Sequence, residues 1–226
     1  MDVEIRSVSR RFQLKNMGVV ALSDISVLFP SGKISVVYGP SGSGKSVLLN
    51  LIAGFDRPDS GSILIDGVDI TSLSWREMND FRRRYISYCM QRNVLIPRFK
   101  VSLNIALPLL IRGVEYEEAL DRAYNVASEL GVEYAFDRPA YTLSGGEQRR
   151  VVLARALIID LDIMLLDEPT SNLDEETADM VRHVIINNYK ERRKTMIIST
   201  HDSGFKGVGH VRLELKQGGI SKLEMD

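Results

Sequence analysis

Hydrophobic and polar residues alternate along the first thirty positions of the chain, as Val3-Glu4-Ile5-Arg6 and Ile25-Ser26-Val27 illustrate. Alternation with a period of two residues predicts strands that bury one face, and such strands usually pair antiparallel. Residues 62–67, Ser-Ile-Leu-Ile-Asp-Gly, add a further strand and a turn. The N-terminal part of the chain is therefore predicted to form an antiparallel sheet.

Short apolar runs follow this alternating part. Residues 34–38 form one run, and others lie near Ile86, Leu165 and Ile197, with helical sequence between them. Apolar strands that alternate with helices are typical of a mainly parallel sheet. Residues 211–220 predict a closing hairpin.

Between about residue 93 and residue 159 the pattern changes to the period of a helix. Five apolar residues there fall on one helical face: Ala119, Ala123, Val126, Ala127 and Leu130. We therefore predict a single α/β domain over residues 1–226. Residues 1–92 and 160–226 would form the core with its antiparallel β part, and residues 93–159 a helical subdomain.

A glycine-rich segment joins the strand 34–38 to an apolar helix that we expect over residues 47–53, with Gly54 as its stop. The segment reads Gly39-Pro40-Ser41-Gly42-Ser43-Gly44-Lys45-Ser46 and matches the Walker A pattern. Its glycines let successive N–H groups point at one anion at the start of a helix. Lys45 would supply a charge to the β and γ phosphates of ATP, and the Ser46 hydroxyl a ligand to Mg²⁺. The alternative is a glycine-rich turn that binds no ligand.

A second glycine-rich segment, Leu143-Ser144-Gly145-Gly146-Glu147-Gln148, also precedes an amphipathic run. It is open to two interpretations. Ser144 can be an ordinary N-cap of a helix. The free N–H groups at such a helix start can equally bind an anion.

Two carboxylates, Asp167 and Glu168, end the apolar run that begins at Ile163. Ligands of open parallel sheets bind at the carboxyl ends of strands. Asp167 would therefore hold Mg²⁺, and Glu168 would polarise a water in line with the γ-phosphate. The alternative is a solvated strand end.

The order of these elements, together with Gln91, Ser171-Asn172-Leu173-Asp174 and His201, resembles the nucleotide-binding subunit of an ABC transporter. The resemblance covers nearly the whole chain. On residues 88–97 and 104–110 the chain is most similar to the lipoprotein-releasing and macrolide-exporter type. This resemblance implies a P-loop NTPase (RecA-like) core, an antiparallel β subdomain and a helical subdomain that carries the signature loop 143–148.

The resemblance also implies roles for single residues. Gln91 would contact Mg²⁺ or the attacking water, and His201 would hold the γ-phosphate and orient Glu168. Asp174 would cross to a partner subunit, and Phe12 would stack on adenine, although an aromatic at a strand end is commonly core. The expected catalytic residues are Glu168, His201 and Gln91, and the expected Mg²⁺ ligands are Ser46, Gln91 and Asp167. The expected nucleotide contacts are Phe12, Gly39, Pro40, Ser41, Gly42, Ser43, Gly44, Lys45, Ser46, Val47, Ser144, Gly145, Gly146, Glu147 and Asp174.

The chain departs from the family pattern at two positions. Val47 stands where threonine is usual, so one phosphate contact would be missing. Asn172 stands where alanine is commoner.

The partners that the resemblance implies are a second copy of the chain, which would form a head-to-tail dimer around two ATP molecules, and an integral membrane permease. Lys and Arg total 29 against 30 for Asp and Glu, so the net charge gives no indication of nucleic-acid binding. The longest apolar stretch, residues 105–111, is far shorter than the ~18 residues of a membrane span. One cysteine and no signal peptide favour the cytosol. We expect a peripheral location on the cytoplasmic face of the membrane.

Two alternatives stay open within this class. One is an ATPase of the cell-division type that signals mechanically and transports nothing. The other is a soluble ATPase that remodels nucleic acid or ribosomes, although such proteins usually carry two fused ATPase halves or a coiled-coil insert.

Overall fold

The chain divides into two compact units in the computed structural model, which describes residues 1–14 and 17–225. Unit 1 comprises Met1–Tyr88, Leu161–Glu168 and Arg193–Asp226, and unit 2 comprises Cys89–Asp160 and Pro169–Arg192. The sequence placed residues 160–226 together in the core. The structure instead groups Pro169–Arg192 with the helical unit, where Leu173 approaches Gly146 and Met180 approaches Gly131.

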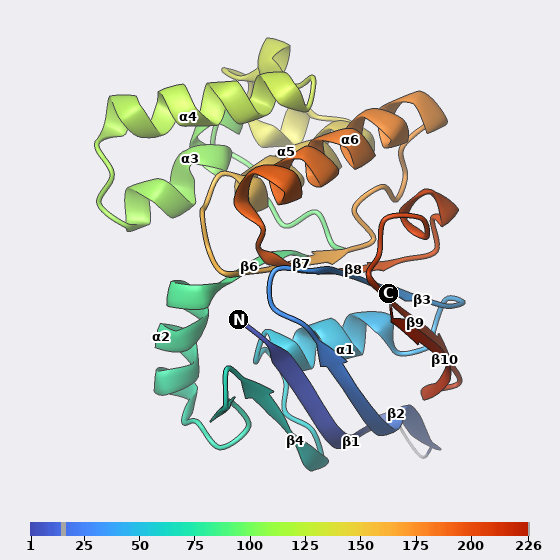
Figure 1. Cartoon of the computed structure of the whole chain (residues 1–226). Coiled ribbons are helices and arrows are strands. Elements are labelled where there is room, and N and C mark those ends of the chain that lie inside the picture. Colours follow the sequence, from blue (N-terminus) through green and yellow to red (C-terminus); the bar gives the residue numbers. More distant parts are fainter. Residues whose placement is uncertain (15–16, 226) are drawn as a thin grey trace. The chain divides into compact units, whose positions relative to one another are not determined.

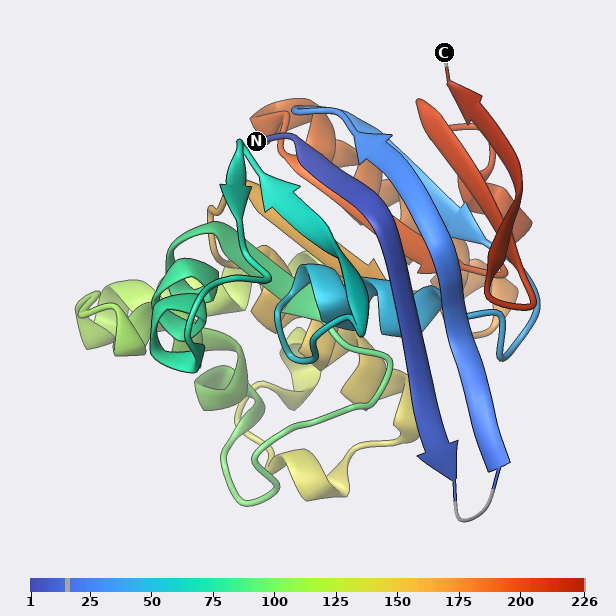
Figure 2. The same cartoon turned by 90° about the horizontal axis from the view of Figure 1, so that it is seen from below.

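The alternating N-terminal segments of unit 1 form a four-stranded sheet, seen from below in Figure 2. Its order is β2 (Met17–Phe29), β1 (Val3–Leu14), β4 (Ser60–Ile65) and β5 (Val68–Asp69), and each neighbouring pair is antiparallel. Ile5 lies opposite Val27 on one side and Ile63 on the other, and all three are buried. The predicted antiparallel sheet is confirmed.

The short apolar runs form a second, six-stranded sheet. Its order is β10 (Gly219–Met225), β9 (Val211–Lys216), β3 (Ile34–Tyr38), β8 (Thr195–Thr200), β7 (Ile163–Asp167) and β6 (Ile86–Cys89). The pairs β9–β3, β3–β8 and β8–β7 are parallel, and β10 pairs antiparallel with β9 as the predicted hairpin. Every residue of β7 and β8 is buried, which explains their unbroken apolar sequence.

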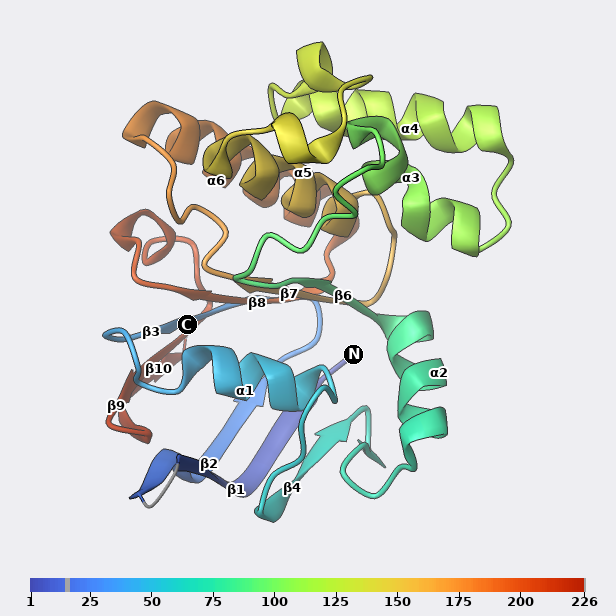
Figure 3. The same cartoon turned by 180° about the vertical axis from the view of Figure 1, so that it is seen from behind.

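Helix α1 (Lys45–Ile52) lies between the two sheets (Figures 1 and 3) and contacts β2, β7 and β8. It buries Leu48, Leu49, Leu51 and Ile52 in a core shared with both sheets. Gly54, just past the helix, has φ of 64°, as a helix stop requires. The predicted helix begins two residues earlier than expected, at Lys45, so its first turn includes the end of the glycine-rich segment. Unit 1 also contains helix α2 (Trp75–Tyr85). A short 3₁₀ turn, η3 (Ser203–Phe205), follows β8.

Unit 2 is helical, as predicted. It contains α3 (Val101–Ile111), α4 (Tyr116–Glu129), α5 (Gly145–Leu157) and α6 (Glu175–Arg192), with two 3₁₀ turns, η1 (Glu133–Ala135) and η2 (Ala140–Thr142). Helix α3 packs against α4 and α5. The expected apolar face is buried at Ala119, Ala123, Ala127 and Leu130, and Val126 is half-buried. None of the helices described combines the length and hydropathy that crossing a bilayer requires.

Candidate functional site

Two glycines of the loop between β3 and α1, Gly39 and Gly44, have neighbours that leave no room for a side chain. Gly44 caps α1 with φ of 106°, and an added Cβ would lie 2.4 Å from the carbonyl oxygen of Ala21. At Gly39, with φ of 149°, a Cβ would lie 2.2 Å from the oxygen of Leu215. Gly44 has no side chain that could accept a hydrogen bond from the first N–H groups of α1. These N–H groups can therefore bind an anion.

Lys45 is buried and bends back over this loop. Its Nζ donates to the carbonyl oxygens of Gly39 at 2.8 Å and Pro40 at 3.2 Å. The same ammonium lies 3.4 Å from Oε1 of Glu168, and both side chains are buried. A positive charge is therefore held at the start of α1 by carbonyl oxygens and one carboxylate.

Asp167, the last residue of β7, collects hydroxyl groups from two other elements. The Ser46 hydroxyl on α1 donates to its Oδ1 at 3.0 Å, and the Ser199 hydroxyl on β8 donates to the same oxygen. Ser46 and Asp167 were both predicted to be Mg²⁺ ligands, and the structure brings their oxygens together. Ser199 was not predicted. Ser199 lies near the carboxyl end of β8, two residues before His201. The rule that ligands bind at the carboxyl ends of parallel strands could have identified it.

Glu168 follows Asp167 with φ of 51°, a left-handed conformation that is uncommon outside glycine. Its N–H donates to the carbonyl oxygen of Ser199 at 2.8 Å. Its Oε2 lies 2.7 Å from Nδ1 of the exposed His201 and accepts from the His201 N–H at 3.3 Å. Strained backbone conformations of this kind cluster at functional sites. The Glu168 carboxylate lies between Lys45 and His201.

The groups in this part of unit 1 fit a nucleotide triphosphate and Mg²⁺. Ser43 Oγ is buried beside the loop and has no hydrogen-bond partner among the described residues. A phosphate oxygen would satisfy it, together with Lys45 and the N–H groups of α1. Ser46 and Asp167 offer hard oxygen ligands, and Mg²⁺ is typically held by one or two such protein groups plus substrate phosphates.

Two further residues of unit 1 were predicted to contact the nucleotide. Phe12 on β1 is half-buried, and the Arg10 guanidinium lies 4.7 Å from its ring centroid. Arg10 is held in turn by Asp56 and Asp59. Val47 is half-buried and packs against the core. That packing gives the Val47 side chain a role in the fold.

The signature loop in unit 2 caps its own helix. Ser144 is the N-cap of α5: its Oγ accepts from the N–H of Glu147 at 3.3 Å, and its own N–H donates to Glu147 Oε2 at 2.6 Å. This reciprocal pair is a capping box.

Glu147 is also held by residues from the preceding turns. The Tyr134 hydroxyl donates to its Oε1 at 2.5 Å, and Arg138 Nη1 lies 3.9 Å from the same oxygen. The hydrogen bonds from Ser144 and then Tyr134 lower the pKa of Glu147 to about 2. The local role of Glu147 is thus to hold the loop. Tyr134 and Arg138 gave no signal in the sequence, because they lie on turns nine or more residues away.

The remaining predicted residues also lie in unit 2. Gln91 is exposed just after β6, and its carbonyl oxygen accepts from Arg149 at 3.3 Å. Asp174 precedes α6 and accepts from the Thr177 N–H at 2.9 Å and the Thr177 hydroxyl at 2.8 Å. Asn172 has φ of 61°. Asparagine tolerates this left-handed conformation better than alanine, which gives its presence a physical reason.

The structure thus brings together Lys45, Ser46, Asp167, Glu168 and His201 in unit 1. Gln91, the signature residues Ser144–Glu147 and Asp174 belong to unit 2.

Comparisons with known proteins agree with this arrangement. Residues 22–171 match the family described as ABC transporter. The chain is 35% identical to the ABC transporter ATP-binding protein YtrE of Bacillus subtilis (strain 168), over 96% of this chain and 95% of that protein. It is 34% identical to the lipoprotein-releasing system ATP-binding protein LolD of Chromohalobacter salexigens, over 97% and 93%.

The solved structures lead to the same family. The dimeric structure of MJ0796, a bacterial ABC transporter cassette, superposes with a TM-score of 0.93 at 30% identity, covering 99% of this chain and 98% of that chain. A dimeric post-hydrolysis state of MJ0796 bound to ADP and Pi gives a TM-score of 0.92. The phosphate-binding loop, the Asp167-Glu168 pair and the match over residues 22–171 together show that the chain belongs to the ABC transporter family and is an ATP-binding cassette ATPase.

Proposed function

We propose that this ATPase works as a homodimer that closes around two Mg²⁺-ATP and drives an integral membrane permease of the lipoprotein-release or macrolide-export type. It would act on the cytoplasmic face of the membrane. The observation that carries the catalytic part is the buried Glu168 carboxylate, which lies beside Lys45 and His201 and directly after Asp167.

The residues divide the work by their chemistry. Lys45 and the N–H groups of α1 would bind the phosphates, and Ser46 and Asp167 would hold a Mg²⁺ that offsets the phosphate charge. Glu168 accepts a proton from the attacking water, and His201 holds the Glu168 carboxylate in place through Nδ1. Gln91 contributes to the Mg²⁺ and water positions, and Phe12 stacks on adenine.

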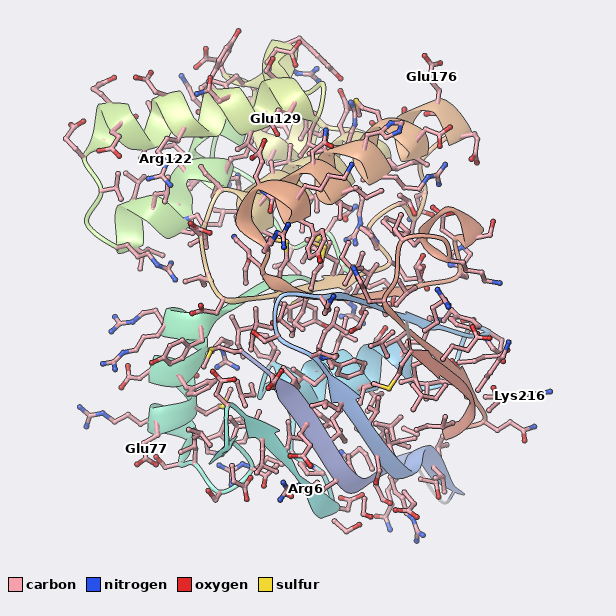
Figure 4. The ribbon with its side chains drawn as sticks, viewed as in Figure 1. Arg6, Glu77, Arg122, Glu129, Glu176 and Lys216 are labelled. Carbon is pink, nitrogen blue, oxygen red and sulfur yellow. The ribbon has the colours of Figure 1, made fainter. Side chains whose placement is uncertain are left out.

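The substitution Glu168→Gln tests the catalytic assignment. The variant should still bind ATP, because the phosphate-binding groups are unchanged, while turnover falls about 10²–10⁴-fold with the loss of a positioned base. Glu176→Gln is the matched control. Glu176 is exposed in the first turn of α6 (Figure 4), and its substitution should leave turnover unchanged. Near-wild-type ATPase activity of Glu168→Gln would assign the base elsewhere.

The proposed dimer draws support from the signature loop. Ser144 and Gly145 are exposed at the start of α5, where the N–H groups of a helix can bind an anion. The γ-phosphate of an ATP bound to a second copy would be such an anion. The similar cassette MJ0796 is described as a dimer.

Sedimentation tests this assembly. The Glu168→Gln variant should be monomeric without nucleotide and dimeric with Mg²⁺-ATP, because ATP completes the interface. Adding Ser144→Arg should prevent the dimer and leave ATP affinity intact, since Ser144 would contact only the nucleotide of the partner subunit. One unchanged species with and without ATP would count against the dimer.

The membrane partner would dock on the loop after Gln91. Leu95 is half-buried, whereas Val94 and Ile96 are exposed together with Pro97 and Phe99. The buried Asn104 holds this loop: its Oδ1 accepts from the Ile96 N–H at 2.8 Å, and its Nδ2 donates to the Ile96 oxygen at 3.1 Å. The loop therefore presents apolar side chains from a fixed backbone.

Purification from native membranes tests the partner. The wild-type chain should sediment with membranes and bring an integral protein with it, and Phe99→Asp should weaken that association. Ile111→Asp is the control, because Ile111 is an exposed apolar residue of the same unit at the end of α3. Wild-type protein found with ribosomes or nucleic acid would favour the remodelling class. An integral partner that moves no substrate would favour the cell-division type.

A further inference from the structure

Arg149, in the second turn of α5, is the largest side chain of unit 2 that is fully buried, with 1% of its surface exposed. A buried guanidinium is strongly unfavourable unless its N–H groups are hydrogen-bonded. The bonds that Arg149 makes are therefore required by the fold, and their acceptors indicate what the arginine holds.

Three of its acceptors are backbone carbonyl oxygens from two separate segments of unit 2. Arg149 Nη1 donates to the oxygen of Met90 and, at 3.3 Å, to the oxygen of Gln91. Arg149 Nε donates to the oxygen of Pro169 at 3.3 Å. Gln91 is the proposed Mg²⁺ and water contact, and Pro169 directly follows Glu168 in the chain.

We infer that Arg149 is a positioning residue, which fixes the backbone of Gln91 and the segment that follows Glu168 against the signature helix. Its side chain is buried and makes these bonds within the chain. It acts through the carbonyl groups of three residues, and the helix that carries it begins at Ser144. This inference rests on the proposed roles of Gln91, Glu168 and Ser144.

The chemistry of the side chain suits this role. A guanidinium presents five donors in a rigid plane, so one side chain can bind acceptors in different directions. An ammonium is a compact charge on a flexible stem and cannot hold the same three oxygens with the same geometry. Glutamine is shorter and carries two donors only. Neither replacement is conservative at this position.

The test compares Arg149→Gln and Arg149→Lys with the wild-type cassette, measuring turnover, ATP affinity and the Mg²⁺ concentration for half-maximal rate. A misplacement of about 1 Å can reduce the rate by about 10²-fold, so turnover should fall about 10–100-fold. ATP affinity should stay within about twofold, because the Walker A loop lies in unit 1. The half-maximal Mg²⁺ concentration should rise, because Gln91 has lost its anchor.

Arg182→Gln is the matched control. Arg182 is a buried arginine of the same unit, but it binds Glu175 and Asp179 within its own helix α6. This variant should lower the melting temperature and leave the turnover per folded molecule and the Mg²⁺ dependence unchanged. A purely structural role of Arg149 predicts the same result for the Arg149 variants.

The outcomes separate this inference from the proposed function. If the wild-type dimer or its Glu168 base fails its own test, the proposed function fails. If those tests succeed but folded Arg149→Gln or Arg149→Lys keeps wild-type turnover and Mg²⁺ dependence, the inference is overturned. Failure of both variants to fold would also overturn it, because Arg149 would then be a folding determinant.

Discussion

Two glycine-rich segments begin helices in this protein, and they use glycine for different reasons. At α1, Gly44 lies at φ of 106° against the backbone of Ala21, so the fold itself excludes a larger residue. At α5, neither Gly145 nor Gly146 has a positive φ, and nothing among the described residues lies within 4 Å of a Cβ added at Gly145. The space around Gly145 within the chain therefore does not require glycine there, which fits the proposed approach of a nucleotide held by a second copy.

A third helix start sharpens this conclusion. Helix α2 has the same capping box as α5, formed by Ser74 and Glu77. The residue after its cap is Trp75, exposed and stacked under Arg57 at 4.9 Å, where α5 has Gly145. The capping boxes are alike, so capping does not distinguish the signature loop from the start of α2. The two differ in the residues after the cap, which are glycines in the signature loop.

The largest expected effect comes from Gly44→Ala. Alanine at this φ is strained by about 1–2 kcal/mol and its Cβ would meet the Ala21 oxygen, so the start of α1 must move. We expect ATP affinity to fall about 100–1000-fold, or about 2.7–4 kcal/mol, by calorimetric titration.

Gly145→Ala is the control for Gly44→Ala. Alanine is the better helix former by about 0.5–1 kcal/mol, so the melting temperature should stay or rise, with ATP affinity of the monomer unchanged. Equal loss of ATP affinity in both variants would contradict the distinction between the two segments.

The next effect is expected from Gly145→Arg. A long side chain in the open position should block the approach of the partner's ATP and reduce turnover about 100-fold, equivalent to about 2.7 kcal/mol. Because the position is exposed and open, the melting temperature should change little. Trp75→Arg places the same side chain after the other capping box and should keep wild-type turnover. A steady-state ATPase assay measures this effect. Equal turnover of wild type and Gly145→Arg would refute the approach of the partner's ATP to Gly145.

A smaller effect is expected at Val47, which follows the Walker A loop. Val47→Thr would add a hydroxyl, and a well-formed bond to a phosphate oxygen would tighten ATP or ADP binding by roughly tenfold. The packing of Val47 against the core supports the opposite result, in which an unpaired hydroxyl destabilises the fold by about 1–3 kcal/mol. Titration with nucleotide beside a melting curve of the empty protein separates the two. Unchanged affinity with a lowered melting temperature would show that Val47 serves only packing.

The smallest effect concerns the capping boxes. Glu147→Gln should lower the free energy of unfolding by about 1 kcal/mol at neutral pH, a typical value for a lost cap. The pKa of Glu147 is lowered to about 2 from 4.5, so its ionised form stabilises the fold above pH 4.5. That stabilisation should disappear as pH falls from 4.5 toward 2, and the wild type and Glu147→Gln should then converge in chemical denaturation.

Glu77→Gln is the control for this measurement. Glu77, labelled on α2 in Figure 4, also has a lowered pKa, caused mainly by its hydrogen bond with Ser74. Its loss should change stability in the same direction and leave turnover unchanged, whereas Glu147→Gln should also reduce turnover. A pH-independent difference between wild type and Glu147→Gln would rule out the carboxylate as the cause.

The sequence by itself determined the local parts of this protein. The period of two residues predicted the antiparallel sheet, and the strand 34–38 and the helix stop at Gly54 lie as expected, although the helix begins two residues early. Asp167 and Glu168 were placed correctly at the end of a strand. These predictions succeeded because each depends on residues a few positions apart, whose spacing fixes the backbone conformation directly.

Only the tertiary structure decided which distant residues meet. The sequence pattern did not distinguish Arg149 from its neighbour Arg150. In the structure Arg149 is buried and donates hydrogen bonds to the carbonyl groups of Met90, Gln91 and Pro169. The same holds for Tyr134 on Glu147 and for the grouping of α6 with the helical unit. These contacts join segments that are far apart in the chain, so they depend on how whole elements pack, and burial then decides which polar groups must be paired.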